Sequence, residues 1–192
     1  ALDECDEVLC VYFLEPRTWS SLAKPSRMGS IRAKFILESL LELQGHIQEL
    51  GGTIEFVQGR AVDEIPKLLQ SYGADCCYTQ KEDAWEEAEQ EHLLTNQINL
   101  IFSGGRGIWE ESDLPFALKD LPGVFSSFRR KLEKNLKIRP LIPAPKKISC
   151  SWTPKNQLPK LRHFDLYESE TDNRAVLAFR GGEDAGISWM RE

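Results

Sequence analysis

The chain has 192 residues and a mass of 21.9 kDa, which suits one domain of ordinary size and a tail. Its composition, 41% hydrophobic and 28% charged, is sufficient to bury a core and excludes wholesale disorder. No apolar run approaches the roughly 20 residues of a membrane span, so the sequence predicts no transmembrane segment.

The net charge of −6 is unevenly distributed. Residues 129–163 hold eleven Lys or Arg and one acid, Glu133, a balance of +10, which leaves −16 for the rest of the chain. Acidic residues cluster in turn between Glu82 and Glu91. The basic stretch suits a phosphate or an acidic protein surface, or it packs against the chain's own acidic face.

The rare reactive residue types give little sign of a metal site or a disulfide framework. Five cysteines show no CxxC spacing, and three histidines show no HxxxH or HxH pairing. Free, buried thiols in a reducing, intracellular compartment are the simplest interpretation. We therefore expect no metal ligand.

Strand-like and helix-like patterns alternate over residues 1–137. Continuous apolar runs predict strands, apolar residues at spacings of three and four predict helices, and Gly or Pro marks the ends. The predicted strands are residues 8–14, 53–57, 74–79 and 98–102. The predicted helices are residues 29–50, 63–73 with Asp63 as its cap, 86–94, and one that starts near Val124. This order predicts an α/β fold, a three-layer sandwich with a parallel Rossmann-like sheet.

Residues 138–192 differ in kind and are expected to form an extended, proline-rich basic arm and a short terminal segment. Five of the ten prolines fall between residues 139 and 160, where they remove backbone donors and fix φ. The candidate partner-binding residues of this arm are Arg139, Lys146, Lys147 and Trp152, because Trp and Arg are frequent binding anchors. The arm is predicted to lie over a neighbouring protein surface; the alternative is an arm folded on its own domain with Trp152 buried there.

Catalytic motifs are weak. Ser103-Gly104-Gly105-Arg106-Gly107 follows a predicted strand but matches neither GxGxxG nor GxxxxGK[ST], so we expect a connection rather than a phosphate loop. No GxSxG elbow occurs, and no Ser or Cys nucleophile has a nearby His and acid. The residues by themselves indicate no active site, and we expect no enzyme.

Five phrases of the sequence resemble the amino-terminal domain of the photolyase/cryptochrome family, with the DASH-type cryptochromes most similar. They are EVLCVYFLEPRTW (7–19), RAKFILESLLELQ (32–44), SDLPF (112–116), LPGVFSSFRRKLEK (121–134) and IRPLIPAPKK (138–147). FRGGEDAG (179–186) is similar to the segment that leads into the family's second domain.

The sequence departs from this family at both ends. Members open on a strand of the type WFR-x-DLR, which is central in their sheet and is not seen before Glu7, so we expect an open position in the sheet. Either residues that precede Ala1 or a partner would fill this position. The helical domain, which the resemblance implies would hold FAD, would begin near Trp189. We therefore expect this polypeptide to bind no FAD and to lack repair activity.

The resemblance also implies an antenna role. In folate-binding members a Glu after the third strand helps to hold the antenna, and Glu82 occupies that position in Glu82-Asp83-Ala84-Trp85-Glu86-Glu87. Ala84 and Trp85 depart from the family's small polar residues. The alternative is a solvated acidic helix.

Three hypotheses about function follow. The first, which we favour, is a non-catalytic module that binds a protein partner, rather than nucleic acid. The second is a folate-type antenna domain of a blue-light photoreceptor or DNA photolyase. The third is a fragment of a complete photolyase or cryptochrome, whose remaining domain would hold FAD. The resemblance makes a chloroplast or another organelle the expected compartment.

Overall fold

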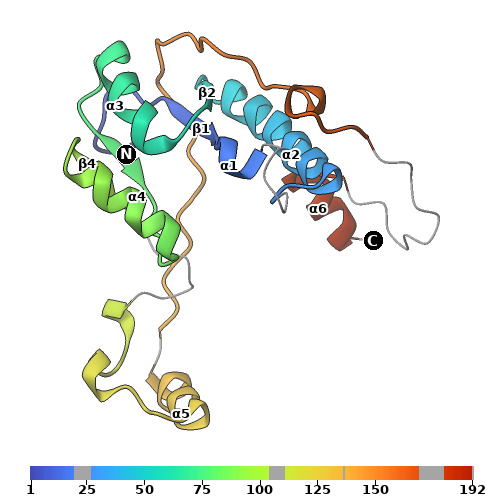
Figure 1. The fold of residues 1–192 in the computed structure, drawn as a ribbon. Coiled ribbons are helices and arrows are strands. Elements are labelled where there is room, and N and C mark those ends of the chain that lie inside the picture. The colour runs from blue at the N-terminus through green and yellow to red at the C-terminus, as the bar shows by residue number, and fades with distance from the viewer. Residues whose placement is uncertain (20–26, 104–110, 136, 169–179, 192) are drawn as a thin grey trace. The chain divides into compact units, whose positions relative to one another are not determined.

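Pairs of parallel strands flanked by helices make up the regular part of the chain (Figure 1). The computed structural model describes residues 1–19, 27–103, 111–135, 137–168 and 180–191. The strands are β1 (Cys10–Leu14), β2 (Ile54–Gln58), β3 (Cys77–Thr79) and β4 (Leu100–Phe102). The α-helices are α1 (Pro16–Trp19), α2 (Ser30–Glu49), α3 (Ala61–Tyr72), α4 (Trp85–Thr95), α5 (Phe125–Asn135) and α6 (Glu183–Arg191). Three 3-10 helices are η1 (Glu111–Asp113), η2 (Leu118–Asp120) and η3 (Leu161–Phe164).

The predicted α/β class is confirmed, with all four predicted strands present and each described pair parallel. The strands predicted at residues 74–79 and 98–102 are shorter, because only their last three residues form ladder bonds. By its contacts the chain groups into two units, Ala1–Ala74 with Pro145–Glu192, and Asp75–Ala144. The predicted domain boundary at residue 137 remains a prediction.

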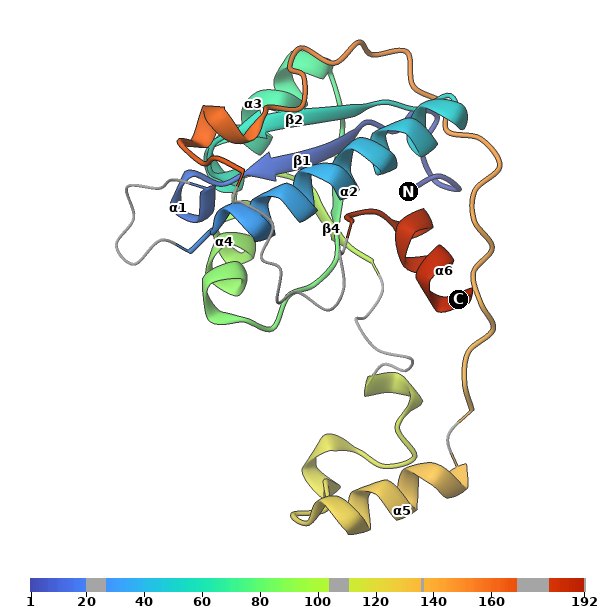
Figure 2. The same ribbon diagram turned by 90° about the vertical axis from the view of Figure 1, so that its right-hand side faces the viewer.

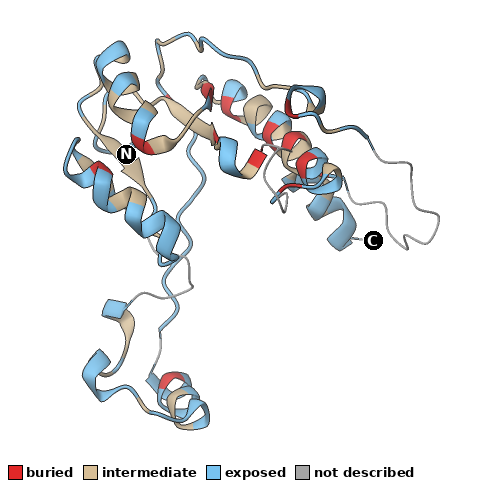
Figure 3. Cartoon of the chain, viewed as in Figure 1, coloured by how far each residue is buried: buried red, intermediate tan, exposed pale blue. Residues whose placement is uncertain are grey.

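In the first unit, alternation along β2 divides its side chains between two faces of the sheet. Ile54 and Phe56 join the core with residues of α2, which runs along the strands in Figure 2. The buried residues of α2 recur at helical spacing and form one stripe. They are Ala33, Leu37, Leu40 and Ile47, and Figure 3 shows buried positions recurring in red along α2.

Glycines end both long helices of this unit as predicted. Gly51 has φ 84° after α2, and Gly73 has φ 64° as the cap of α3, where its N–H bonds to the carbonyl of Leu69. The start of α3 was predicted wrongly. The cap is Arg60 rather than Asp63, and Asp63 lies inside the first turn, where its charge suits the positive end of the helix.

The edges of β1 are unequal. The N–H of Cys10 bonds to the carbonyl of Thr53 at 3.3 Å, so Cys10, Tyr12 and Leu14 direct their backbone groups toward β2. Val11 and Phe13 therefore direct theirs to the opposite edge, and no strand among the described residues pairs there. Four of the five residues of β1 are only half-buried, whereas strands of a parallel sheet are normally covered on both faces.

Residues 137–160 contain neither helix nor strand. The Gly-rich segment 104–107 lies outside the described residues. Within the described part of the chain, no helix is long and apolar enough to cross a membrane.

Candidate functional site

Glu82 lies between β3 and α4, in the second unit. Its N–H donates to Oε1 of Glu91 at 2.8 Å, its side chain is half-buried, and its Oε2 is out of contact with solvent. Burial raises the pKa of Glu91, and the charges of Asp83 and Glu87 raise it further against the opposing effect of Lys81. The local fold therefore shields Oε2 of Glu82 from solvent and holds the Glu91 carboxylate against the backbone of Glu82.

The remainder of the acidic phrase faces solvent. Ala84 caps α4, and the Trp85 side chain is 76% exposed. Asp83, Glu86, Glu87 and Glu89 are exposed as well. This arrangement matches the solvated acidic helix, apart from Glu82 and Glu91.

Arg139 is held by its own unit. Its Nε and Nη2 donate to Oδ1 of Asp113 at 3.0 and 2.8 Å, and Nη2 also donates to Oγ of Ser112 at 3.1 Å. These charge-assisted bonds fasten the start of the arm to η1. The structure thus gives Arg139 an internal contact in addition to any role with a partner.

Lys146 and Lys147 are exposed beside a buried anchor, Ile148. The N–H of Ile148 donates to the carbonyl of Leu50 at 2.8 Å, and a Cβ at Gly52 would lie 2.8 Å from the Ile148 side chain. Because this anchor fixes the backbone, both ammonium groups are presented on the surface of the first unit.

Trp152 contacts its own unit, although it is not buried there as the alternative interpretation of the arm expected. Its ring lies edge-on to Tyr72 at the end of α3, with centroids 6.0 Å apart, and Nζ of Lys155 lies 4.7 Å from the centroid of the same Tyr72 ring. Trp152 is half-buried, so part of it remains accessible to a partner.

Glu55, which the sequence reasoning missed, is the most buried polar residue described, with 0% exposure in the middle of β2. Its Oε2 accepts the N–H of Lys155 at 2.6 Å and the hydroxyl of Tyr72 at 3.2 Å, and its Oε1 accepts Nδ2 of Asn156 at 2.5 Å. Burial, followed by the charge of Glu55, raises the pKa of Tyr72. All three donors come from the same unit, so Glu55 serves to hold the arm. The sequence signal that could have identified Glu55 is its position as an acid within the apolar run Ile54–Val57.

The thiols are less buried than the sequence predicted. None of the five cysteines forms a disulfide, and all five are half-buried. Burial raises the pKa of Cys10, with a contribution from Cys150, and burial likewise raises the pKa of Cys77. A raised pKa suppresses the nucleophilic thiolate, so these two residues are poorly suited to covalent catalysis.

Comparisons with known proteins agree with this fold. The cryptochrome DASH of Gloeobacter violaceus is 29% identical over 199 residues, covering 100% of this chain and 40% of that protein. The chloroplastic/mitochondrial cryptochrome DASH of Arabidopsis thaliana is 27% identical over 205 residues, covering 100% of this chain and 35% of that protein. The chain thus spans about two fifths of the length of these relatives.

A solved structure and a family model complete the comparison. The crystal structure of a Synechocystis cryptochrome matches with a TM-score of 0.86 and 29% identity, covering 100% of this chain and 41% of that one. This match supports the Rossmann-like sandwich predicted from the sequence. The family model described as DNA photolyase matches residues 1–147, so the chain belongs to the DNA photolyase family, as its amino-terminal α/β region.

Proposed function

We propose that this α/β region is a non-catalytic module that binds a protein partner. The observation that carries the proposal is the exposed arm, where Leu141 and Ile142 are 97% and 93% exposed. The second edge of β1, which no described strand pairs, is a further candidate contact. Soluble proteins protect such edges, because an unpaired row of N–H and C=O groups is a template for another chain. A strand from residues that precede Ala1 would satisfy these groups, as would an extended segment of a partner that adds a strand here.

The arm supports the same proposal with exposed apolar surface. The side chains of Leu141 and Ile142 are 97% and 93% exposed between Pro140 and Pro143. Proline restricts the segment before binding and so reduces the entropy lost on docking. Lys146 and Lys147 add positive charge suited to an acidic partner, and the accessible part of Trp152 and the guanidinium of Arg139 are further candidate contacts.

Amide hydrogen exchange on the chain, alone and in complex with a partner co-purified from native cells, tests the open edge. In the free chain the amides of Cys10 and Tyr12 are expected to be protected by β2, whereas those of Val11 and Phe13 exchange faster. Binding is expected to slow exchange at Val11 and Phe13. Recovery of the native protein without a stoichiometric partner would falsify the proposal, and unchanged exchange at both residues in the complex would exclude this edge as a contact.

A variant provides a second measure of the same edge. Val11→Pro removes an N–H that points away from β2 and retains the ladder bonds of Cys10 and Tyr12, a position where proline is tolerated. We expect partner affinity to fall by roughly tenfold or more, as for an interface residue that contributes at least 1.4 kcal/mol. Phe13→Pro has the same geometry and replaces Val11→Pro if that variant does not fold.

Antenna binding is the second candidate, and the shielded carboxylate of Glu82 favours it. A carboxylate accepts hydrogen bonds only, so it fits the N–H donors of a folate-type pterin, which when bound would absorb in the near ultraviolet. An absorption spectrum of native material separates the candidates: a folate band that is lost in Glu82→Gln supports the antenna. Stoichiometric flavin released from residues 1–192 would contradict the expectation that this polypeptide binds no FAD.

The compartment follows from the relatives and the thiols. The Arabidopsis relative is named as chloroplastic/mitochondrial, and cysteines that form no disulfide suit a reducing interior. We propose an organelle such as the chloroplast as the site of action.

A further inference from the structure

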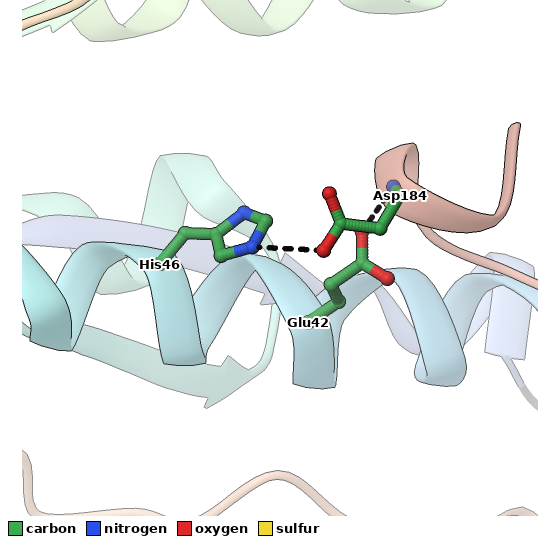
Figure 4. A group of neighbouring side chains, drawn as sticks. All are labelled: Glu42, His46 and Asp184. Carbon is green, nitrogen blue, oxygen red and sulfur yellow. Dashed lines mark hydrogen bonds and ion pairs between the residues drawn. The ribbon is translucent and has the colours of Figure 1, made fainter. Parts of the chain in front are cut away.

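Three side chains with metal-binding atoms converge where α2 meets α6, within the first unit (Figure 4). Glu42 and His46 are four residues apart on α2 and therefore share one face of the helix. Asp184 enters from the first turn of α6. One ligand atom from each residue lies within 4.8 Å of the other two.

Backbone contacts, rather than the three side chains alone, create this convergence. The N–H of Gly181 donates to Oε2 of Glu38 at 2.8 Å, and the N–H of Asp184 donates to Oε1 of Glu42 at 2.9 Å. Gly182 has φ 117°, and a Cβ there would overlap the Glu42 carboxylate. Glycine at this position lets the start of α6 approach α2 closely enough to place Asp184 beside His46.

We propose that Glu42, His46 and Asp184 form a site for a divalent first-row transition metal ion of the Zn²⁺ class. Nε2 of His46 lies 3.3 Å from Oδ2 of Asp184. Two ligands of a tetrahedral ion with bonds of about 2.0–2.1 Å are separated by about 3.3–3.4 Å. The pair thus already has the spacing of adjacent ligands, and a carboxylate oxygen of Glu42 lies within 4.8 Å of both.

Charge and ligand type favour the same ion. The carboxylates of Glu42 and Asp184 both lie close to the imidazole of His46. A dication would reduce the repulsion between the two negatively charged carboxylates. An imidazole ligand selects Zn²⁺ and its neighbours over Mg²⁺ and Ca²⁺. Asp184 is exposed, which leaves room for water to complete the coordination.

The ion would fasten α6 to α2, because Glu42 lies on α2 and Asp184 lies on α6. These two ligands are 142 residues apart in the sequence. No sequence motif links these residues, because they are distant along the chain. The expectation of no metal ligand considered only the spacing of histidines and could not detect this group. Metal binding would stabilise the folded state by mass action and hold the segment that begins at Gly181.

Titration of the untagged chain with Zn²⁺ by calorimetry, and with Co²⁺ by visible absorption, tests the site. We expect saturable 1:1 binding and the d–d bands of Co²⁺ held by nitrogen and oxygen. His46→Ala and Asp184→Asn each remove a ligand, so the dissociation constant should rise by more than roughly 10-fold, the smallest effect typical even of residues that only support ligands.

Glu38→Gln is the matched control, because it alters an α6 docking contact without removing a ligand. It should retain metal binding. Absence of saturable binding, unchanged binding in His46→Ala, equal loss in Glu38→Gln, or a thiolate-to-Co²⁺ charge-transfer band would each overturn the proposal. His46→Gln replaces His46→Ala if circular dichroism shows that the alanine variant is unfolded.

Discussion

At the scale of single residues, Glu55 shows how one buried carboxylate organises a segment that has no regular structure. Its two oxygens receive donors from α3 and from the arm, so the same residue is bonded to Tyr72, Lys155 and Asn156. An isolated charge in an apolar sheet would be strongly unfavourable. The three donors compensate this cost and make the position of the arm specific.

We predict that Glu55→Ala destabilises the chain by about 2–4 kcal/mol, because it leaves a cavity and three donors without their acceptor. Glu55→Gln should cost less, since its amide oxygen still accepts one donor. Urea unfolding followed by circular dichroism measures both. Glu49→Ala, at an exposed position near the end of α2, is the control and should change the free energy of unfolding by less than about 0.5 kcal/mol. A loss for Glu55→Ala no larger than that of the control would mean that the network contributes nothing.

At the scale of elements, the docking of α6 depends on two adjacent glycines. A Cβ at Gly181 would overlap the backbone of Phe35, and a Cβ at Gly182 would overlap Glu42. Here the absence of a side chain, rather than an apolar contact, allows two helices to meet. This explains why a short helix with no buried residue nevertheless has a defined place.

We predict that Gly182→Ala detaches α6, at a cost of roughly 1–3 kcal/mol for the strained backbone alone. Faster amide exchange across Glu183–Arg191 would report the loss. Gly186→Ala lies in the same helix, where an added Cβ meets nothing within 4 Å. This control should leave exchange unchanged or slow it, since Ala favours a helix over Gly by about 1 kcal/mol. If both variants behave alike, close packing at Gly182 does not position the helix.

At the scale of the whole molecule, local sequence patterns predicted the helices and strands. They did not predict which distant residues contact one another. Apolar runs located all four strands, because a parallel strand requires such a run. Leu43 is one of the apolar residues at spacings of three and four in α2, yet it is 46% exposed. Periodicity identifies the apolar face of a helix but not how far burial extends across that face. Glu55 and Asp184 form hydrogen bonds with residues 100 and 142 positions away in the sequence, and no local rule anticipates these contacts. Glu82 came from the family resemblance, and its half-buried position was then found in the structure.

Exposure distinguishes the residues of the arm that serve the fold from those that remain for a partner. Trp152 and Arg139 already contact the chain itself, so their substitution changes the fold as well as any interface. Leu141 and Ile142 have almost no contact with the rest of the chain at 97% and 93% exposure. They are therefore the cleaner test of the binding role.

We predict that Leu141→Ser combined with Ile142→Ser leaves the free energy of unfolding within about 0.5 kcal/mol of the original value, as for surface changes in general. Partner affinity should fall by about 2 kcal/mol or more, the loss of an interface hot spot. Calorimetric titration with the co-purified partner measures the affinity, and urea unfolding measures the stability. Lys146→Glu with Lys147→Glu should instead slow association and reverse its dependence on salt, because exposed charges act mainly on the encounter rate. If both double variants bind within about 1 kcal/mol of the unmodified chain, the arm is not the contact, and the open edge of β1 alone must account for binding.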